Sequence, residues 1–102
     1  MSQRHAFERW LDHDARLFVE FTTHERDVVS YSIILTVFDE DEIHTVRVYD
    51  AAHAINEMHR HTRTGGKQSG EPFHGGTLGE GLRTAMADCV DGYRRMIEGW
   101  DR

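Results

Sequence analysis

The sequence has one cysteine, one proline and no long apolar run, and each scarcity excludes a class of protein. The single thiol of Cys89 excludes an internal disulfide and does not make a zinc framework by itself. The run Ile33-Ile34-Leu35 is far short of the ~20 apolar residues that a membrane span needs. The start, MSQRHAFERW, lacks the charged and then apolar pattern of a signal peptide. We therefore expect a cytoplasmic, soluble protein with no membrane contact.

Positive charge is also scarce, since 12 Lys and Arg residues stand against 18 Asp and Glu residues and the net charge is −6. An acidic body disfavours general nucleic-acid binding, which depends on phosphate neutralisation. The segment 51–76 differs, because its three basic residues exceed its two acidic ones. A phosphate or a short RNA could therefore still bind at this segment.

The length of 102 residues and the apolar content of 38% suit one domain, residues 1–102, with a single core of two packed layers. Alternating apolar and polar residues predict strands at 16–22, 28–38 and 43–49. Short polar turns between these strands are typical of an antiparallel meander. Residues 56–63 favour a fourth strand, although a helix over 51–62 stays open.

Helical spacing marks both ends of the chain. Phe7, Trp10 and Leu11 are spaced i, i+3, i+4, which predicts a short helix over residues 3–12 that covers part of the sheet. Thr77 and Glu80 match a capping box, and the apolar residues that follow recur at intervals of three and four, which predicts a helix of about six turns. Packing of this helix on one face of a three- to four-stranded sheet gives an α+β domain.

Residues 53–77 carry most of the groups suited to chemistry. If residues 56–63 form a strand, His59 and His61 project to the same side. Together with Arg63 and Lys67, they supply the parts for metal-independent RNA cleavage: a base, an acid and cations that stabilise the phosphorane. Histidine suits both proton-transfer roles because it titrates near neutrality. The alternative is that these are ordinary surface histidines on a polar edge strand.

His74 comes three residues before the predicted N-cap of the long helix. Gly75 and Gly76 allow close approach of a ligand to the backbone, and a helix N-terminus favours anions. We therefore predict His74 as a further catalytic residue, with Gly75, Gly76 and Thr77 as ligand-binding residues. The alternative is that the two glycines only form a tight turn into the helix.

A metal site is a second interpretation of the same segment. The candidate ligands are His53, His59, His61 and His74, helped by Asp50 or Glu57. The sequence has no CxxC or HExxH signature. In the lead hypothesis, which needs neither a metal nor another cofactor, His53 and Asp50 are ligand-binding residues instead.

The segment Tyr49-Asp50-Ala51-Ala52-His53, followed by His59-Arg60-His61, resembles small bacterial toxins of the TumE-like type. The resemblance covers about a quarter of the chain, and this sequence lacks the family's Asn after Asp50 and its Pro before His53. The stretch NEMHRHTRTGGKQ is closer to uncharacterised small actinobacterial or phage-borne domains. The resemblance implies a toxin-like ribonuclease with an antitoxin-like partner.

The lead hypothesis is a small toxin-like protein whose histidine-rich site acts on RNA or another phosphate-bearing ligand, as a metal-independent ribonuclease. Two alternatives remain: a non-catalytic module that binds a protein partner, and a domain that binds a metal through histidines. The sequence leaves a homodimer open.

Overall fold

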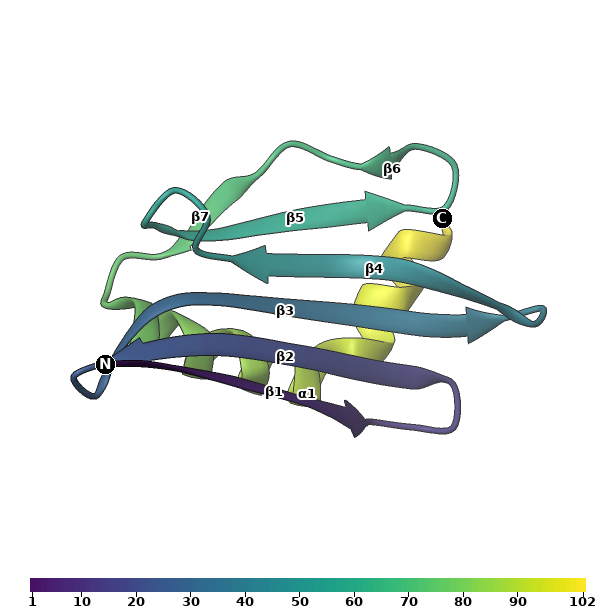
Figure 1. The fold of residues 1–102 in the computed structure, drawn as a ribbon. Coiled ribbons are helices and arrows are strands. Elements are labelled where there is room, and N and C mark those ends of the chain that lie inside the picture. Colours follow the sequence, from purple (N-terminus) through teal and green to yellow (C-terminus); the bar gives the residue numbers. More distant parts are fainter.

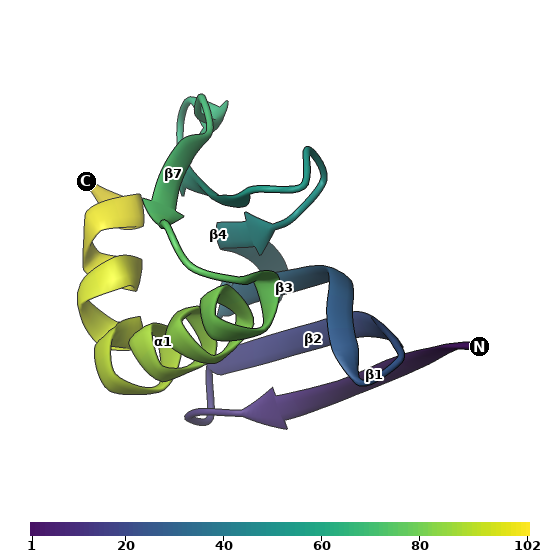
Figure 2. The same cartoon turned by 90° about the vertical axis from the view of Figure 1, so that its left-hand side faces the viewer.

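Antiparallel strands that follow one another along the chain make up most of the structure, a computed structural model that describes residues 1–102 (Figure 1). The elements are β1 (Ser2–Trp10), β2 (Ala15–His24), β3 (Asp27–Asp39), β4 (Glu42–Asp50), β5 (Asn56–Thr62), β6 (Gly66–Lys67), β7 (Glu71–His74) and α1 (Leu78–Asp101). The sheet has the order β1-β2-β3-β4-β5-β6, and β7 also pairs with β5. The helix crosses one face of the sheet and contacts β3, β4, β5 and β7 (Figure 2). The α+β architecture and the long C-terminal helix are therefore confirmed.

The predicted N-terminal helix is wrong, because Ser2–Trp10 form β1. The spacing of Phe7, Trp10 and Leu11 fits a helical face, but the edge of β2 offers β1 a backbone ladder from Ser2–His24 to Trp10–Arg16. A helix of ten residues is marginal without tertiary support, and the ladder supplies more hydrogen bonds. Phe7 and Trp10 stay 44% and 50% exposed, so they do not cover the sheet as expected.

The predicted central strands lie within β2, β3 and β4, and the ambiguous segment 56–63 is a strand, β5. The sheet has more strands than predicted, because β1 joins one edge while β6 and β7 join the other. The short strands β6 and β7 pair with successive parts of β5, and Gln68–Gly70 interrupt them. The outer edge of the sheet at β5 is therefore irregular.

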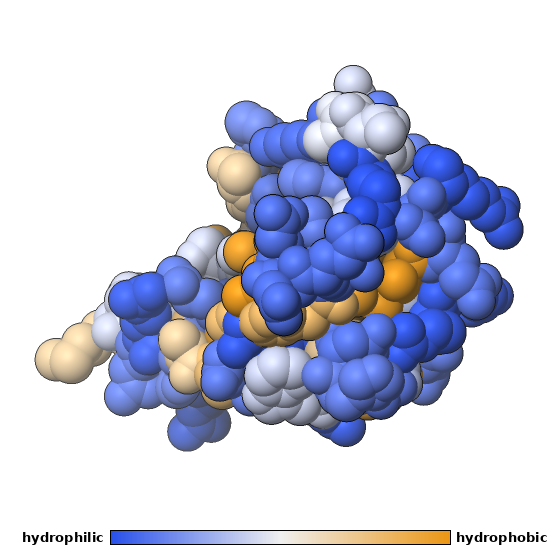
Figure 3. Space-filling model, turned by 90° about the vertical axis from the view of Figure 1, so that its right-hand side faces the viewer, coloured by the Kyte–Doolittle hydropathy of each residue, from blue (hydrophilic) through white to orange (hydrophobic).

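The core lies between the sheet and α1. Its fully buried side chains include Leu17, Ile33, Leu35, Val46, Tyr49 and Cys89. Burial raises the pKa of the Cys89 thiol to about 12, as expected for an inert packing residue. At the end of the molecule shown in Figure 3 the surface is mainly hydrophilic, and apolar residues appear in narrow strips. No helix combines the length and the apolar character that a membrane crossing requires.

The capping box predicted at the start of α1 is present. The Thr77 hydroxyl accepts a hydrogen bond from the Glu80 amide, and the Glu80 carboxylate accepts one from the Thr77 amide. These bonds satisfy two backbone donors that a helix start leaves open.

The amide of Asn56 joins the sheet to the start of α1. Asn56 is 2% exposed, and its Oδ1 accepts a hydrogen bond from the Tyr31 hydroxyl at 2.6 Å. Its Nδ2 donates to three backbone oxygens just before α1, those of His74 (3.3 Å), Gly76 (3.1 Å) and Thr77 (3.2 Å). A Cβ on Gly81 would overlap the Asn56 side chain. One buried side chain therefore fixes β3, β5 and the helix N-terminus relative to one another.

We predict that Asn56→Asp lowers the free energy of unfolding more than Tyr31→Phe. Aspartate keeps the shape but places an unpaired buried charge against three carbonyl oxygens, a cost of about 3 kcal/mol or more. Removing the Tyr31 hydroxyl breaks one neutral hydrogen bond, at roughly 1–2 kcal/mol. Urea unfolding of both variants measures the difference. Equal losses would show that the bonds from Nδ2 contribute little.

Candidate metal centre

The face of the sheet opposite α1, here called the open face, carries no helix (Figure 2). Asn56 and Met58 of β5 are buried on the α1 side, so the alternation of side chains directs Glu57 and His59 to the open face. Asp50, at the end of β4, lies directly opposite Glu57. The ligand atoms of Asp50, Glu57 and His59, here called the β4–β5 cluster, all lie within 4.8 Å of one another.

Two carboxylates face each other in this cluster without a lysine or arginine partner. The side chains of Asp50 and Glu57 are only 21% and 16% exposed, and His59 is the ion-pair partner of both. Like charges directly opposite on neighbouring strands destabilise a sheet, and low exposure removes much of the water that would screen them. The cluster therefore has excess negative charge that a bound cation would neutralise.

The ring of His59 is oriented by the backbone. Its Nδ1 lies 3.2 Å from the carbonyl oxygen of Gln68, which can only accept a hydrogen bond, so Nδ1 carries the proton. Its Nε2 lies 2.9 Å from Glu57 Oε1 and 3.8 Å from Asp50 Oδ2. In this tautomer the lone pair of Nε2 points at the two carboxylates, and a metal ion between these three groups would be attracted by all of them. Histidine ligands in metal sites are commonly held by such a hydrogen bond from the other ring nitrogen.

The segment between β6 and β7 closes one side of the cluster. Gly70 approaches so closely that a Cβ there would overlap the side chains of Glu57 and His59. On the other side an open hollow of about 490 Å³ reaches Asp50, and its polar lining includes Glu20, Thr22, Ser30, Ser32 and Asp50. The cluster is thus shielded at Gly70 and accessible at Asp50.

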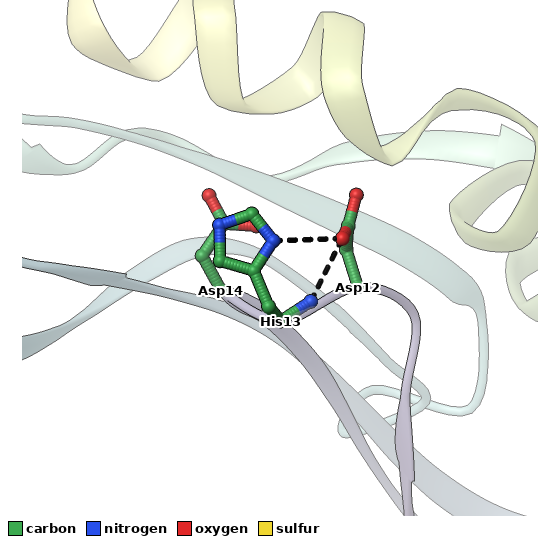
Figure 4. A group of neighbouring side chains, drawn as sticks. All are labelled: Asp12, His13 and Asp14. Atoms are coloured by element: carbon green, nitrogen blue, oxygen red, sulfur yellow. Dashed lines mark hydrogen bonds and ion pairs between the residues drawn. The ribbon is translucent and has the colours of Figure 1, made fainter.

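A second group of acidic and histidine residues, Asp12, His13 and Asp14, lies in the turn between β1 and β2 (Figure 4). Here Arg94 of α1 donates to both carboxylates, each at 2.9 Å, and the Tyr93 hydroxyl donates to Asp12. His13 is 86% exposed. Arg94 already supplies a positive charge to both carboxylates of this turn cluster and ties the turn to α1. The β4–β5 cluster has no such partner.

Comparison with known proteins gives one match. The sequence model described as "Domain of unknown function (DUF7718)" matches residues 1–102. The chain belongs to the DUF7718 family. No curated protein and no solved structure matches it. The expectation of an uncharacterised family agrees with this result, whereas the resemblance to TumE-like toxins is not supported by it.

In the DUF7718 chain, two of the histidines predicted to act together, His59 and His61, project to one face of β5. His61 is on the open face two residues after His59, opposite Lys67 of β6. Burial, followed by the positive charge of Lys67, lowers the pKa of His61, and its Nε2 is buried without a hydrogen-bond partner. His61 is therefore a neutral ring beside the cluster. His53 lies exposed in the turn after β4, outside it.

His74 and the residues after it already bind one another. His74 Nδ1 accepts a hydrogen bond from the Gly76 amide at 2.9 Å, and the Glu80 carboxylate occupies the helix start beside Thr77. Hydrogen bonds from the Thr77 amide and hydroxyl lower the pKa of Glu80, so a negative charge stands where a phosphate was expected. Gly75 has open space beside it. His74 pairs with Asn56, three residues from His59 along β5, or roughly 10 Å.

Arg63, another predicted catalytic residue, lies at the far end of β5 from Asn56. It forms ion pairs with Asp39 and Asp101 and stacks over Trp100, 4.4 Å from the ring centroid. These contacts hold the end of α1 to the sheet.

Sequence reasoning missed Gln68 and Gly70, which orient and shield His59, because their only signal was a glycine-rich loop. It named Asp50 and Glu57 as candidate metal ligands but did not predict that they lie opposite each other on neighbouring strands.

We predict that Arg94→Gln destabilises the DUF7718 domain at neutral pH and does so much less in acid. Hydrogen bonds from Arg94 hold the pKa of Asp14 below its usual range. The pKa of Asp12 is lowered by the His13 amide and ring, then by Tyr93 and Arg94. A lowered folded-state pKa gives stability that is present above the unfolded value, about 3.9, and is lost as the pH falls through the folded value.

Urea unfolding of the parent and of Arg94→Gln at pH 7, and again well below pH 3.9, measures this dependence. The two curves should differ at pH 7 and converge in acid. A difference of the same size at both pH values would mean that Arg94 acts by packing and not by charge.

Proposed function

We propose that this domain binds a divalent transition-metal cation through Asp50, Glu57 and His59. The observation that carries the proposal is the facing pair of mostly buried carboxylates, whose one ion-pair partner is an imidazole nitrogen. Imidazole suits Zn²⁺, Fe²⁺, Cu²⁺ and Ni²⁺, and carboxylates also suit Mn²⁺. The cluster is a subset of the ligands named from the sequence, without His53, His61 and His74.

Three protein ligands leave an open coordination position, as in catalytic zinc sites and unlike closed structural ones. In this proposal the open position is on the side of Asp50, where the hollow reaches the cluster. A bound water or a phosphate oxygen fits there. A phosphate-bearing ligand would then bind to the cation. It would not bind at the helix start, because the Glu80 carboxylate already occupies that position.

We predict that protein purified without a histidine tag binds one Zn²⁺ per chain. At free zinc of about 100 times the dissociation constant, binding adds roughly 2.7 kcal/mol of stability, which raises Tm by roughly 10–20 °C for a domain of this size. Calorimetric titration and thermal unfolding with Zn²⁺ and with Mn²⁺ measure both quantities. Glu57→Gln and His59→Gln should each weaken binding about tenfold or more.

His13→Ala is the matched control, because it removes a histidine from the turn cluster and leaves the β4–β5 cluster intact. It should bind Zn²⁺ like the parent. If His13→Ala abolishes binding, or if Glu57→Gln and His59→Gln keep the parental affinity, the cation is bound elsewhere. If the parent shows no binding, the proposal is wrong.

A second candidate function is metal-independent cleavage of RNA, as proposed from the sequence. The observation that favours it is the neutral ring of His61 beside His59, with the cation Lys67 opposite. In this proposal His61 is the base, His59 in its protonated form is the acid and Lys67 stabilises the developing charge. A cytoplasmic location and an antitoxin-like protein partner belong to the same proposal.

For this candidate we expect RNA cleavage that persists in EDTA and falls at least about 100-fold in His59→Ala and in His61→Ala. His74→Ala should keep its activity, because His74 lies outside the pair, so it serves as the control. Cleavage of a short RNA, followed on gels with and without EDTA, tests the set. Cleavage that EDTA abolishes assigns the chemistry to a bound cation instead, and no cleavage by the parent excludes a nuclease.

A further inference from the structure

One edge of the sheet is long, regular and uncovered. All nine residues of β1 are exposed, and β1 pairs with β2 on one side only. Its other side presents a row of unpaired backbone donors and acceptors, which is the usual template for pairing with another chain. The opposite edge of the sheet lacks this property, because β6 has two residues, β7 has four and contains Pro72, and Gln68–Gly70 separate them. Strand β1 contains no proline, glycine or lysine that would block an added strand.

The charges along β1 are complementary to those of a second copy. When two β1 strands run antiparallel about a two-fold axis at Ala6, Arg4 lies directly opposite Glu8 of the other copy, and the pair occurs twice. Both side chains are on the open face, since Arg4 contacts Glu20 at 2.6 Å and Glu8 contacts Arg16 at 3.6 Å. Glu20 and Arg4 of one copy, followed by Glu8 and Arg16 of the other, then form a row of alternating charge across the interface. Moving the axis to His5 or Phe7 removes both pairs, so charge selects one register.

The same register covers apolar surface. On the α1 side of the sheet, Phe7 (44% exposed) lies opposite His5 of the other copy, and His5 already stacks on Phe21 at 4.7 Å. On the open face, an apolar hollow of about 310 Å³ extends over β1, β2 and β3, and its lining includes Ala6, Phe18 and Ile34. In a dimer with its axis at Ala6, this hollow would adjoin the hollow of the second copy.

We infer that the chain forms a symmetric homodimer by antiparallel pairing of β1 with β1 of a second copy, centred on Ala6. The interface is isologous, so it closes at two copies and does not propagate. The result is one continuous sheet with both helices on the same side. The inference is independent of the metal proposal, because three strands separate β1 from β5 in the sheet.

A charge-exchange experiment tests the register. Sedimentation equilibrium should show a dimer for the parent, and Arg4→Glu or Glu8→Arg should each raise its dissociation constant at least tenfold. Mixing the two variants should restore a dimer that contains one copy of each, because every facing pair is then opposite in charge. Arg9→Glu, on the other face and opposite Gln3, is the matched control and should stay dimeric.

A disulfide test is independent of charge. Directly opposite residues of antiparallel strands have Cα atoms about 4.5–5.5 Å apart, within disulfide range. Ala6→Cys should therefore form a covalent dimer on oxidation, and Arg4→Cys should not. The buried Cys89 does not interfere. A parent that stays monomeric at every concentration measured, or a mixture of the charge variants that stays monomeric, would overturn the inference.

Discussion

The buried side chain of Asn56 joins the sheet to the start of the helix. Its amide oxygen accepts a hydrogen bond from Tyr31 of β3, and its amide nitrogen donates to three backbone oxygens just before α1. Burial and the charge of Asp50 raise the pKa of Tyr31 to about 12, so its hydroxyl remains a donor to Asn56. Because Asn56 is fixed on the α1 side, the alternation of β5 places Glu57 and His59 on the opposite face. The residue that joins the sheet to the helix therefore also positions the candidate metal centre.

Two groups of similar composition show how partners decide what a cluster can do. In the turn between β1 and β2, Arg94 brings a positive charge to Asp12 and Asp14, and the result is a structural tie. Between β4 and β5, the one ion-pair partner of Asp50 and Glu57 is the imidazole of His59. Carboxylates that an arginine binds in one cluster therefore have no lysine or arginine partner in the other.

Sequence reasoning predicted the parts of the fold that local pattern determines. Alternation located β2, β3 and β4, and the capping box located the start of α1. It failed at β1, where the spacing of Phe7, Trp10 and Leu11 fits a helical face but the backbone pairs with the edge of β2. It also failed at β6 and β7, which are too short to show a period. The site was predicted in part. His59 was named first, but the register that sets Asp50 opposite Glu57 is not visible in any one strand, nor is the pairing of Arg63 with Asp101, 38 residues away.

If a cation binds between Asp50, Glu57 and His59, its position can be measured crystallographically. Crystals grown with Zn²⁺, with diffraction recorded on both sides of the zinc absorption edge, locate the ion without reference to activity. We expect one strong anomalous peak about 2.0–2.1 Å from His59 Nε2 and in contact with oxygens of Asp50 and Glu57. A peak at the exposed His13, or no peak in the β4–β5 cluster, would contradict it.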